Sequence, residues 1–192
     1  MCGIVGVYYF EPDRQVQSHD LKLMTDAMIH RGPDDEGFYV EGRVGLGMRR
    51  LSIIDIAGGH QPISTSDKKK TVVFNGEAYN YIEQRKLLEE HGYSFKTNSD
   101  TEVVLNLFDK NEADCYKYIN GMFGFAIWDS EKNKLTLARD RIGIKPVYYY
   151  QDSEKLVFAS EIKSILAFPG IPKELDRDVL PEYFKYGYTS PS

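Results

Sequence analysis

The sequence predicts an α+β fold, in which helices and largely antiparallel sheets form a layered sandwich. Three observations favour this class. Strand-like runs occur in pairs separated by short turns, as at 37–40 with 44–48 and again over 121–139. Helical patterns occur between these groups and do not alternate with single strands, as they would in a parallel α/β fold. Aromatic residues make up 13% of the chain, and most are Tyr and Phe, which suit strands.

The first part of the chain predicts a strand, a helix and a hairpin in that order. Residues 4–10 are β-branched and aromatic, and turn residues follow them. Apolar residues recur at helical spacing over 18–30, after Ser18, which is the expected N-cap. The hairpin turn is expected at Glu41-Gly42, and RLSIID at 50–55 is expected to continue in β conformation.

The middle of the chain predicts a strand with a sharp end. TVVFNGEAYN at 71–80 has a strand pattern, and Asn75-Gly76 is expected to bend it. Asn80 is the expected cap of the helix that follows.

The last part predicts one more helix, then mainly strands. Ser99 and Glu102 have the spacing of a capping box before an apolar helical run. Strand patterns dominate from Gly121, and a short helix is expected at 161–168. The final residues, 176–192, begin what reads as another helix, which suggests a linker or the start of a further domain.

Length and charge exclude several classes of protein. At 192 residues the chain is long enough for one domain with a real core. Its 24 basic and 29 acidic residues give a net charge of -5, which argues against a nucleic-acid partner. Two cysteines are too few for a disulfide framework or a cysteine zinc site, so a cytoplasmic location is expected. We expect no membrane span and no metal site.

Cys2 is the first candidate for chemistry. Removal of Met1 would leave a cysteine that carries both a thiol and a free α-amine. The ordinary pKa of an α-amine, about 7.7–8.0, lets it accept the thiol proton near neutral pH. This is the arrangement of an N-terminal nucleophile that supplies its own base. The alternative is a small buried residue at the start of a strand, and position alone favours that alternative.

Three further positions complete a hypothetical acyl-transfer site. The Asn75 side chain and the Gly76 N–H could donate two hydrogen bonds to one oxyanion, although an Asn-Gly turn is the simpler interpretation. Arg50 could clamp a carboxylate, or form an ordinary ion pair. Asp100 could accept hydrogen bonds from an ammonium, or only stabilise the start of a helix. A substrate held by Arg50 at one end and Asp100 at the other is an α-amino acid.

At these residues the chain resembles the class II glutamine amidotransferases, which are N-terminal nucleophile (Ntn) hydrolases. The resemblance is to their asparagine synthetase branch, in particular the N-terminal glutaminase domain of glutamine-hydrolysing asparagine synthetase. It covers nearly the whole chain. It rests on a series of motifs in order: MCGIVGV at the start, HRGPDDEG at 30–37, RRLSIID at 49–55, Gln61-Pro62, FNGEAYN at 74–80, SDTE at 99–102, GMFGFAIWD at 121–129, RDRIGIKPVYY at 139–149 and FASEIKSIL at 158–166.

The resemblance implies a glutamine-hydrolysing enzyme with three catalytic positions. Cys2, as the mature N-terminus, attacks the glutamine carboxamide and forms a γ-glutamyl thioester. Its α-amine acts as general base and then protonates the departing ammonia. Asn75 and the Gly76 N–H stabilise the oxyanion. The thioester is then hydrolysed to glutamate.

The resemblance also implies how glutamine is bound. Arg50 holds the α-carboxylate, and Asp100, with help from Glu77, holds the α-ammonium. Apolar residues form the wall of the pocket: Leu51, Ile53 and Ile54. The implied fold is a four-layer αββα sandwich over residues 2–175.

In this family the ammonia passes to a C-terminal synthetase domain, in which ATP and Mg²⁺ activate aspartate. The chain has no Ser-Gly-Gly-x-Asp-Ser loop for pyrophosphate, so we expect no cofactor in this fragment and a missing synthetase domain as its partner. A homodimer is compatible with the sequence. Three alternatives stay open: another ammonia acceptor, a non-catalytic homologue that keeps the fold, and an amino-acid binding module without turnover.

Overall fold

Two antiparallel sheets form the centre of the molecule in the computed structural model, which describes residues 1–55 and 58–189. The strand order is β2-β3-β1-β9-β8 in the first sheet and β4-β5-β6-β7 in the second. The first sheet consists of β1 (Gly3–Tyr9), β2 (Asp35–Glu41), β3 (Val44–Arg50), β8 (Tyr148–Gln151) and β9 (Lys155–Ala159). The second consists of β4 (Ile63–Ser64), β5 (Lys70–Ala78), β6 (Gly121–Asp129) and β7 (Lys134–Arg139).

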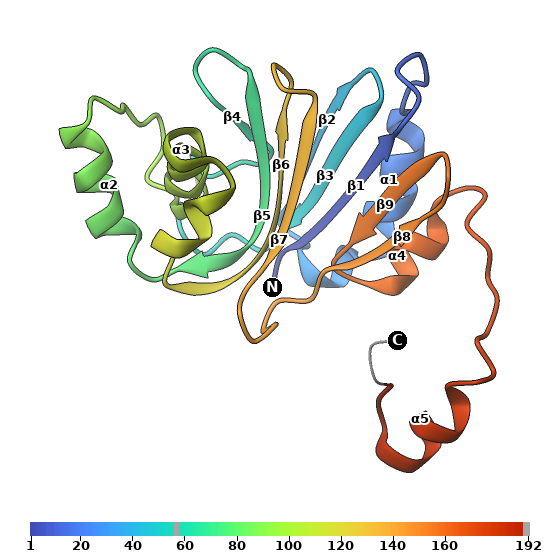
Figure 1. The fold of residues 1–192 in the computed structure, drawn as a ribbon. Coiled ribbons are helices and arrows are strands. Elements are labelled where there is room, and N and C mark those ends of the chain that lie inside the picture. The colour runs from blue at the N-terminus through green and yellow to red at the C-terminus, as the bar shows by residue number, and fades with distance from the viewer. Residues whose placement is uncertain (56–57, 190–192) are drawn as a thin grey trace.

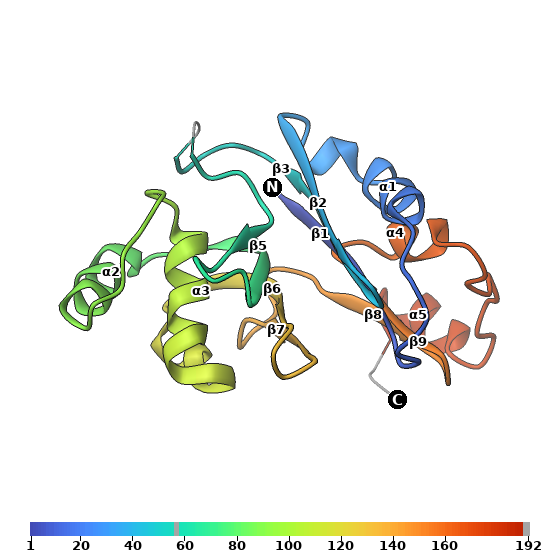
Figure 2. The same cartoon turned by 90° about the horizontal axis from the view of Figure 1, so that it is seen from above.

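Helices cover the two outer faces of this pair of sheets (Figures 1 and 2). On the first sheet lie α1 (Ser18–Asp26) and α4 (Ile162–Ala167). On the second lies α3 (Asp100–Asn111), with α2 (Tyr81–Glu90) outside it. Two 3-10 helices span Ile29–Arg31 and Glu112–Tyr118. The expected four-layer αββα sandwich is confirmed.

The strand alternation divides the apolar residues into three clusters, one between each pair of layers. In β5, Val73 faces the first sheet, and Val72 and Phe74 face α3. In β1, Ile4 faces the second sheet, whereas Val5 packs toward α1 and α4. Because successive strand residues point to opposite faces, a two-sided burial pattern of this kind requires a cover on both sides.

The sequence-based expectations for two strand ends are wrong. β3 ends at Arg50, so 51–55 is not a strand. β5 does not bend at Asn75-Gly76 but runs on to Ala78, with Gly76 opposite Phe123 of β6. A Cβ on Gly76 would lie 2.3 Å from the Met122 carbonyl oxygen. The glycine is therefore needed because β5 and β6 lie close together, and not because the chain turns.

Of the three expected helix caps, one lies at another residue and one lies at the expected residue without a capping side-chain bond. Gln17, and not Ser18, is the N-cap of α1. Asn80 is the N-cap residue of α2 as expected, but its side chain makes no capping hydrogen bond and bonds instead to the backbone of Tyr118 and Asn120. Ser99 does cap α3, accepting a hydrogen bond of 3.1 Å from Thr101 N–H.

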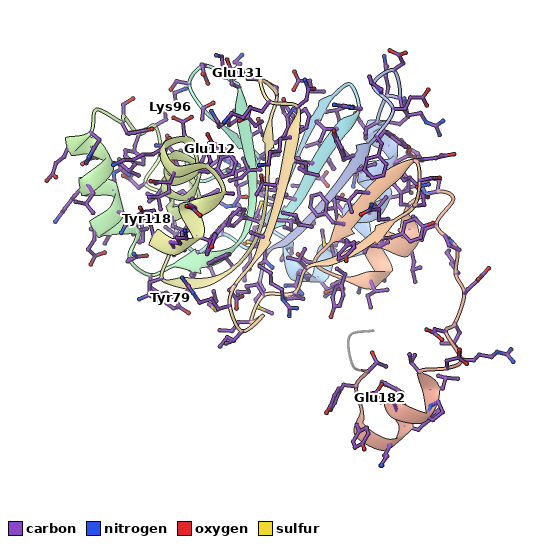
Figure 3. All side chains as sticks on the ribbon, in the orientation of Figure 1. Tyr79, Lys96, Glu112, Tyr118, Glu131 and Glu182 are labelled. Atoms are coloured by element: carbon purple, nitrogen blue, oxygen red, sulfur yellow. The ribbon has the colours of Figure 1, made fainter. Side chains whose placement is uncertain are left out.

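The segment predicted as a linker contains a short helix, α5 (Leu180–Tyr186). It lies apart from the four layers, at the end of an extended stretch, and Glu182 marks it among the side chains (Figure 3). The last three residues of the predicted 176–192 segment lie outside the described residues. Within the described part of the chain, no helix is both long and apolar enough to cross a membrane.

Candidate active site

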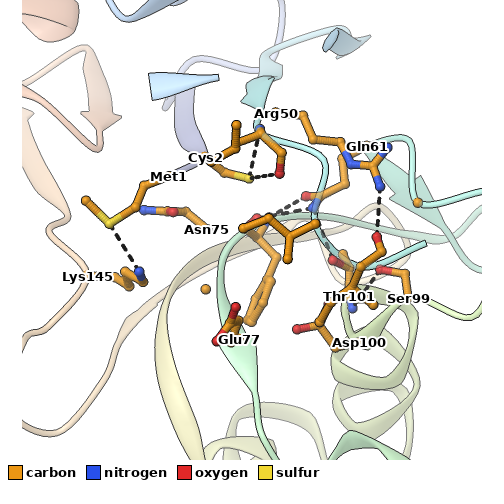
Figure 4. Close-up of a pocket in the computed structure, with 16 residues that line it drawn as sticks. Met1, Cys2, Arg50, Gln61, Asn75, Glu77, Ser99, Asp100, Thr101 and Lys145 are labelled. Atoms are coloured by element: carbon orange, nitrogen blue, oxygen red, sulfur yellow. Dashed lines mark hydrogen bonds between the residues drawn. The ribbon is translucent and has the colours of Figure 1, made fainter. Parts of the chain in front are cut away.

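One pocket lies where the start of β1, the ends of β3 and β5 and the first turn of α3 meet (Figure 4). Its cavity volume, with Met1 among the lining residues, is about 70 Å³. All nine residues that the sequence predicts for the site line it: Cys2, Arg50, Leu51, Ile53, Ile54, Asn75, Gly76, Glu77 and Asp100. These residues come from four separate segments, so the fold brings together what the sequence separates.

Cys2 lies just before β1, with its Sγ beside the chain that leaves β3. The Leu51 N–H donates to this sulfur at 3.4 Å, and the sulfur lies 3.6 Å from the Leu51 carbonyl oxygen. Burial raises the pKa of the Cys2 thiol above its ordinary value, while the Leu51 hydrogen bond, the positive chain terminus and Arg50 oppose this shift. A thiol in this environment needs a nearby base to become a nucleophile.

Arg31 fixes the backbone of Cys2, a role that sequence reasoning missed. Its Nε donates to the Cys2 carbonyl at 2.9 Å, and its Nη1 pairs with Glu161 at 3.2 Å. Arg31 belongs to the HRGPDDEG motif, so the motif indicated its segment, but the two partners lie 29 and 130 residues away along the chain. No local pattern predicts contacts of this range.

Arg50 ends β3 and is enclosed by the loop that follows. Its Nη2 donates to the carbonyls of Ile54 at 3.0 Å and Asp55 at 2.7 Å. A Cβ on Gly59 would lie 2.5 Å from this Nη2, so the close approach depends on glycine. The guanidinium is therefore held in place at the pocket wall. Its neighbour Arg49 instead forms ion pairs with Asp26 and Glu36, and these three residues lie outside the pocket.

The open edge of β5 presents one N–H group to the pocket. The Phe74 N–H bonds to the Gln61 side chain, and the Ala78 N–H bonds to Asp100, so both point away from β6. Because strand N–H groups alternate in direction, the N–H of Gly76 points the same way. Among the described residues we find no acceptor for it.

The Asn75 side chain supplies a second donor at the same place. It follows Val73 on the face that is directed to the first sheet, where Cys2 lies. Asn75 is 1% exposed, and its Nδ2 has no hydrogen-bond partner within the described part of the chain. Two unpaired donors side by side next to a thiol form a site for an oxygen that gains negative charge.

Two carboxylates line the pocket opposite Arg50. Asp100 opens α3, and its Oδ2 accepts from the Ala78 N–H at 3.0 Å. Burial raises the pKa of Asp100, hydrogen bonds from backbone N–H groups oppose this, and the charge of Glu77 raises it further. A cation between the two carboxylates would relieve this repulsion.

Gln61 joins the two halves of the pocket, although sequence reasoning assigned it no role. Its amide oxygen accepts from the Phe74 N–H at 2.7 Å, and its amide nitrogen donates to the Phe74 carbonyl and the Thr101 hydroxyl. The side chain thereby connects β5, just before Asn75, to α3, just after Asp100. Such a fully bonded buried amide fixes its neighbours rigidly.

The apolar residues of the pocket differ in depth. Ile53 is 63% exposed and lies at the mouth, whereas Leu51 and Ile54 are partly buried. Within the described residues no group of His, Cys, Asp and Glu side chains is arranged to hold a metal ion.

A family model for the glutamine amidotransferase domain matches residues 1–192. The chain belongs to the glutamine amidotransferase domain family. Among curated proteins, this amidotransferase domain is 41% identical over 189 residues to asparagine synthetase [glutamine-hydrolyzing] 3 of Bacillus subtilis, covering 97% of the chain and 31% of that protein. It is 37% identical over 169 residues to asparagine synthetase B of Escherichia coli, covering 86% of the chain and 30% of that protein. The amidotransferase domain thus spans about a third of the length of these relatives.

Solved structures support the same fold. The amidotransferase domain superposes on glutamine phosphoribosylpyrophosphate amidotransferase from Bacillus subtilis with a TM-score of 0.72 at 18% identity. The match covers 87% of the chain and 43% of that structure. At this identity the likeness concerns the fold, which is of the Ntn-hydrolase type.

Proposed function

We propose that this domain hydrolyses L-glutamine to glutamate and ammonia, with Cys2 as an N-terminal nucleophile. One observation carries the proposal. The buried Asn75 Nδ2 has no partner among the described residues, and the Gly76 N–H, which by strand alternation points away from β6, lies in the same pocket as the Cys2 thiol. The unpaired buried donor of Asn75 costs free energy in the resting protein, and an oxyanion in the transition state would pair with it and with the Gly76 N–H.

Removal of Met1 starts the proposed mechanism by creating a free α-amine on Cys2. This amine takes the thiol proton, and the thiolate attacks the carboxamide carbon. The C–N bond then breaks, and ammonia departs with the proton from the amine. A water molecule, deprotonated by the same amine, attacks the γ-glutamyl thioester. The C–S bond then breaks, glutamate is released, and the sulfur takes back the proton from the amine to regenerate the thiol. Each proton passes through the same base.

The two ends of the pocket fit the two charges of an amino acid. Arg50 supplies the donors for the α-carboxylate, while Asp100 and Glu77 supply the acceptors for the α-ammonium. Leu51, Ile53 and Ile54 lie beside them as the apolar wall. Placing both charges fixes the distance from the α-carbon to the thiol, and this distance selects the length of the side chain.

In the whole protein we propose that the ammonia serves asparagine synthesis from aspartate in the cytoplasm. The relatives named as glutamine-hydrolysing asparagine synthetases are about three times as long as the matched part, which supports a partner domain in the same chain. ATP and Mg²⁺ would act in that domain, because thioester hydrolysis here needs only side chains and water. Residues 176–192 would lead into it.

The test of the proposed function is hydrolysis of glutamine by the purified chain. We expect release of glutamate from L-glutamine but not from D-glutamine, whose α-ammonium and α-carboxylate are exchanged in space. L-Asparagine, whose side chain is one methylene shorter, is the second control, and we expect no release of aspartate from it. Binding of L-glutamine without release of glutamate, measured by calorimetry, would instead support an amino-acid binding module.

Replacing Arg50 by alanine should raise the KM for glutamine steeply. A charge-assisted clamp on a carboxylate is worth about 1.5–3 kcal/mol, so the increase should be roughly 10- to 150-fold. The neighbouring Arg49 is the matched control, because its ion pairs with Asp26 and Glu36 lie outside the pocket. Arg49→Ala should lower the free energy of unfolding and leave KM unchanged. An unchanged KM in Arg50→Ala contradicts the assigned role.

A further inference from the structure

A buried lysine lies against the residue that precedes the nucleophile. Lys145 is 6% exposed and lines the pocket. Its Nζ lies 3.2 Å from the Sδ of Met1, and no carboxylate lies within 4.0 Å of it in the described part of the chain (Figure 4). The Met1 thioether, a weak acceptor, is the one hydrogen-bond partner of this buried amine among the described residues, which calls for a functional explanation.

The turn that carries this lysine is built to hold it. The Asp140 carboxylate accepts from the N–H of Lys145 at 2.9 Å and from that of Phe123 on β6 at 3.2 Å. Although burial raises it, these backbone hydrogen bonds hold the pKa of Asp140 below its ordinary value, so the anchor stays charged. Arg139 donates to the Lys145 carbonyl at 3.1 Å. Phe123 lies opposite Gly76, so the turn is anchored on the strand next to the oxyanion site.

Removal of Met1 would change what Lys145 faces. The side chain that it contacts would leave, and the nitrogen of Cys2, which lines the same pocket, would become a free α-amine. Charged groups from several elements line the pocket around Cys2 or contact its backbone. Arg50 of β3, Glu77 of β5, Asp100 of α3 and Lys145 line the pocket, and Arg31 of the 3-10 helix bonds to the Cys2 carbonyl. Asp100 and Glu77 favour a protonated amine, and they are the groups that the substrate ammonium engages under the proposed function.

We propose that Lys145 is a positioning residue that keeps the α-amine of the mature Cys2 unprotonated near neutral pH. The inference rests on the proposed function, because it requires Met1 removal and an amine base. A fixed positive charge beside an amine disfavours a second positive charge, so it opposes the effect of the two carboxylates. The same charge favours the thiolate. Lys145 therefore sets the pH above which the nucleophile and its base are ready.

The test compares Lys145→Met with Lys145→Arg in the mature protein. In Lys145→Met, the acidic midpoint of the pH profile of kcat/KM for glutamine should move up by about 1 pH unit. The pH midpoint for alkylation of Cys2 by iodoacetamide should move up with it, because the thiol and the amine titrate as a coupled pair. Lys145→Arg keeps the charge and should keep both midpoints. Cys115, buried and with its thiol pKa raised to about 12 by burial, should stay unmodified.

Lys155→Met is the matched control. Lys155 is 8% exposed, and it lies at the end of β9 that is paired with Tyr9, away from Cys2. It should destabilise the fold through loss of the Asp152 ion pair and leave both midpoints unmoved.

The two readouts separate failure of this inference from failure of the proposed function. An active wild type with unmoved midpoints in Lys145→Met would overturn the role of Lys145. A higher KM with unmoved midpoints would assign Lys145 to substrate binding, and would also overturn its proposed effect on the α-amine. If the wild type releases no glutamate but the alkylation midpoint still moves, the glutaminase proposal fails and the electrostatic role of Lys145 stands.

Discussion

Cys2→Ala is expected to abolish glutamine hydrolysis, with a decrease of at least about 10⁴-fold in kcat. The thiol sulfur is the attacking atom, and among the described residues no second thiol lines the pocket to form the thioester. The fold should persist, because the change removes one partly buried sulfur whose contacts are long ones to Leu51. Glutamate release and urea denaturation of the same preparation measure both effects.

Cys115→Ala is the matched control for the loss of a thiol. Cys115 is 1% exposed in the cluster between α3 and the second sheet, outside the pocket. Its replacement should lower the free energy of unfolding and leave kcat unchanged. If Cys2→Ala kept wild-type glutamate release, the nucleophile assignment would be contradicted.

Asn75→Ala should lower kcat by about 10²- to 10³-fold with little change in KM. Loss of one oxyanion donor has this magnitude, because the donor acts on the charge that develops in the transition state. Stability should fall little, since the Asn75 Nδ2 has no partner in the described structure to lose. Deleting an unpaired buried donor removes a desolvation cost, which offsets part of the lost packing.

Asn106→Ala is the control that separates loss of an unpaired buried amide from loss of an oxyanion donor at Asn75. The Asn106 Nδ2 is also buried and unpaired among the described residues, but Asn106 lies on α3 outside the pocket. Its replacement should change stability about as little and leave kcat unchanged. Equal losses of kcat in the two variants would rule out an oxyanion role for Asn75.

The layers of the fold could be predicted only in part from residue patterns. Alternation and capping predicted most strands and the start of α3, because these signals are local. The four-layer order came from the resemblance to a family, since no local pattern states which sheet faces which. RLSIID has strand character, yet the chain leaves the sheet after Arg50 because the loop encloses its guanidinium.

The site was predicted in its members but not in its geometry. Asn75-Gly76 carries a turn signal, and pairing along the whole of β6 overrides it. That straight strand is what aligns the Gly76 N–H with the pocket. Three residues received no specific role from the sequence because their partners lie far along the chain. Arg31 contacts Cys2 and Glu161. Gln61 contacts Thr101, and Lys145 contacts Met1.

The central claim is that the α-amine of Cys2 is the general base, and its most direct test is the intact mass of the protein that hydrolyses glutamine. We predict a mass lower than that of the full sequence by one methionine residue, with Cys2 as the first residue in N-terminal sequencing. Fully active protein that retains Met1 would contradict the account, because the amine would then be an amide nitrogen that cannot accept the proton.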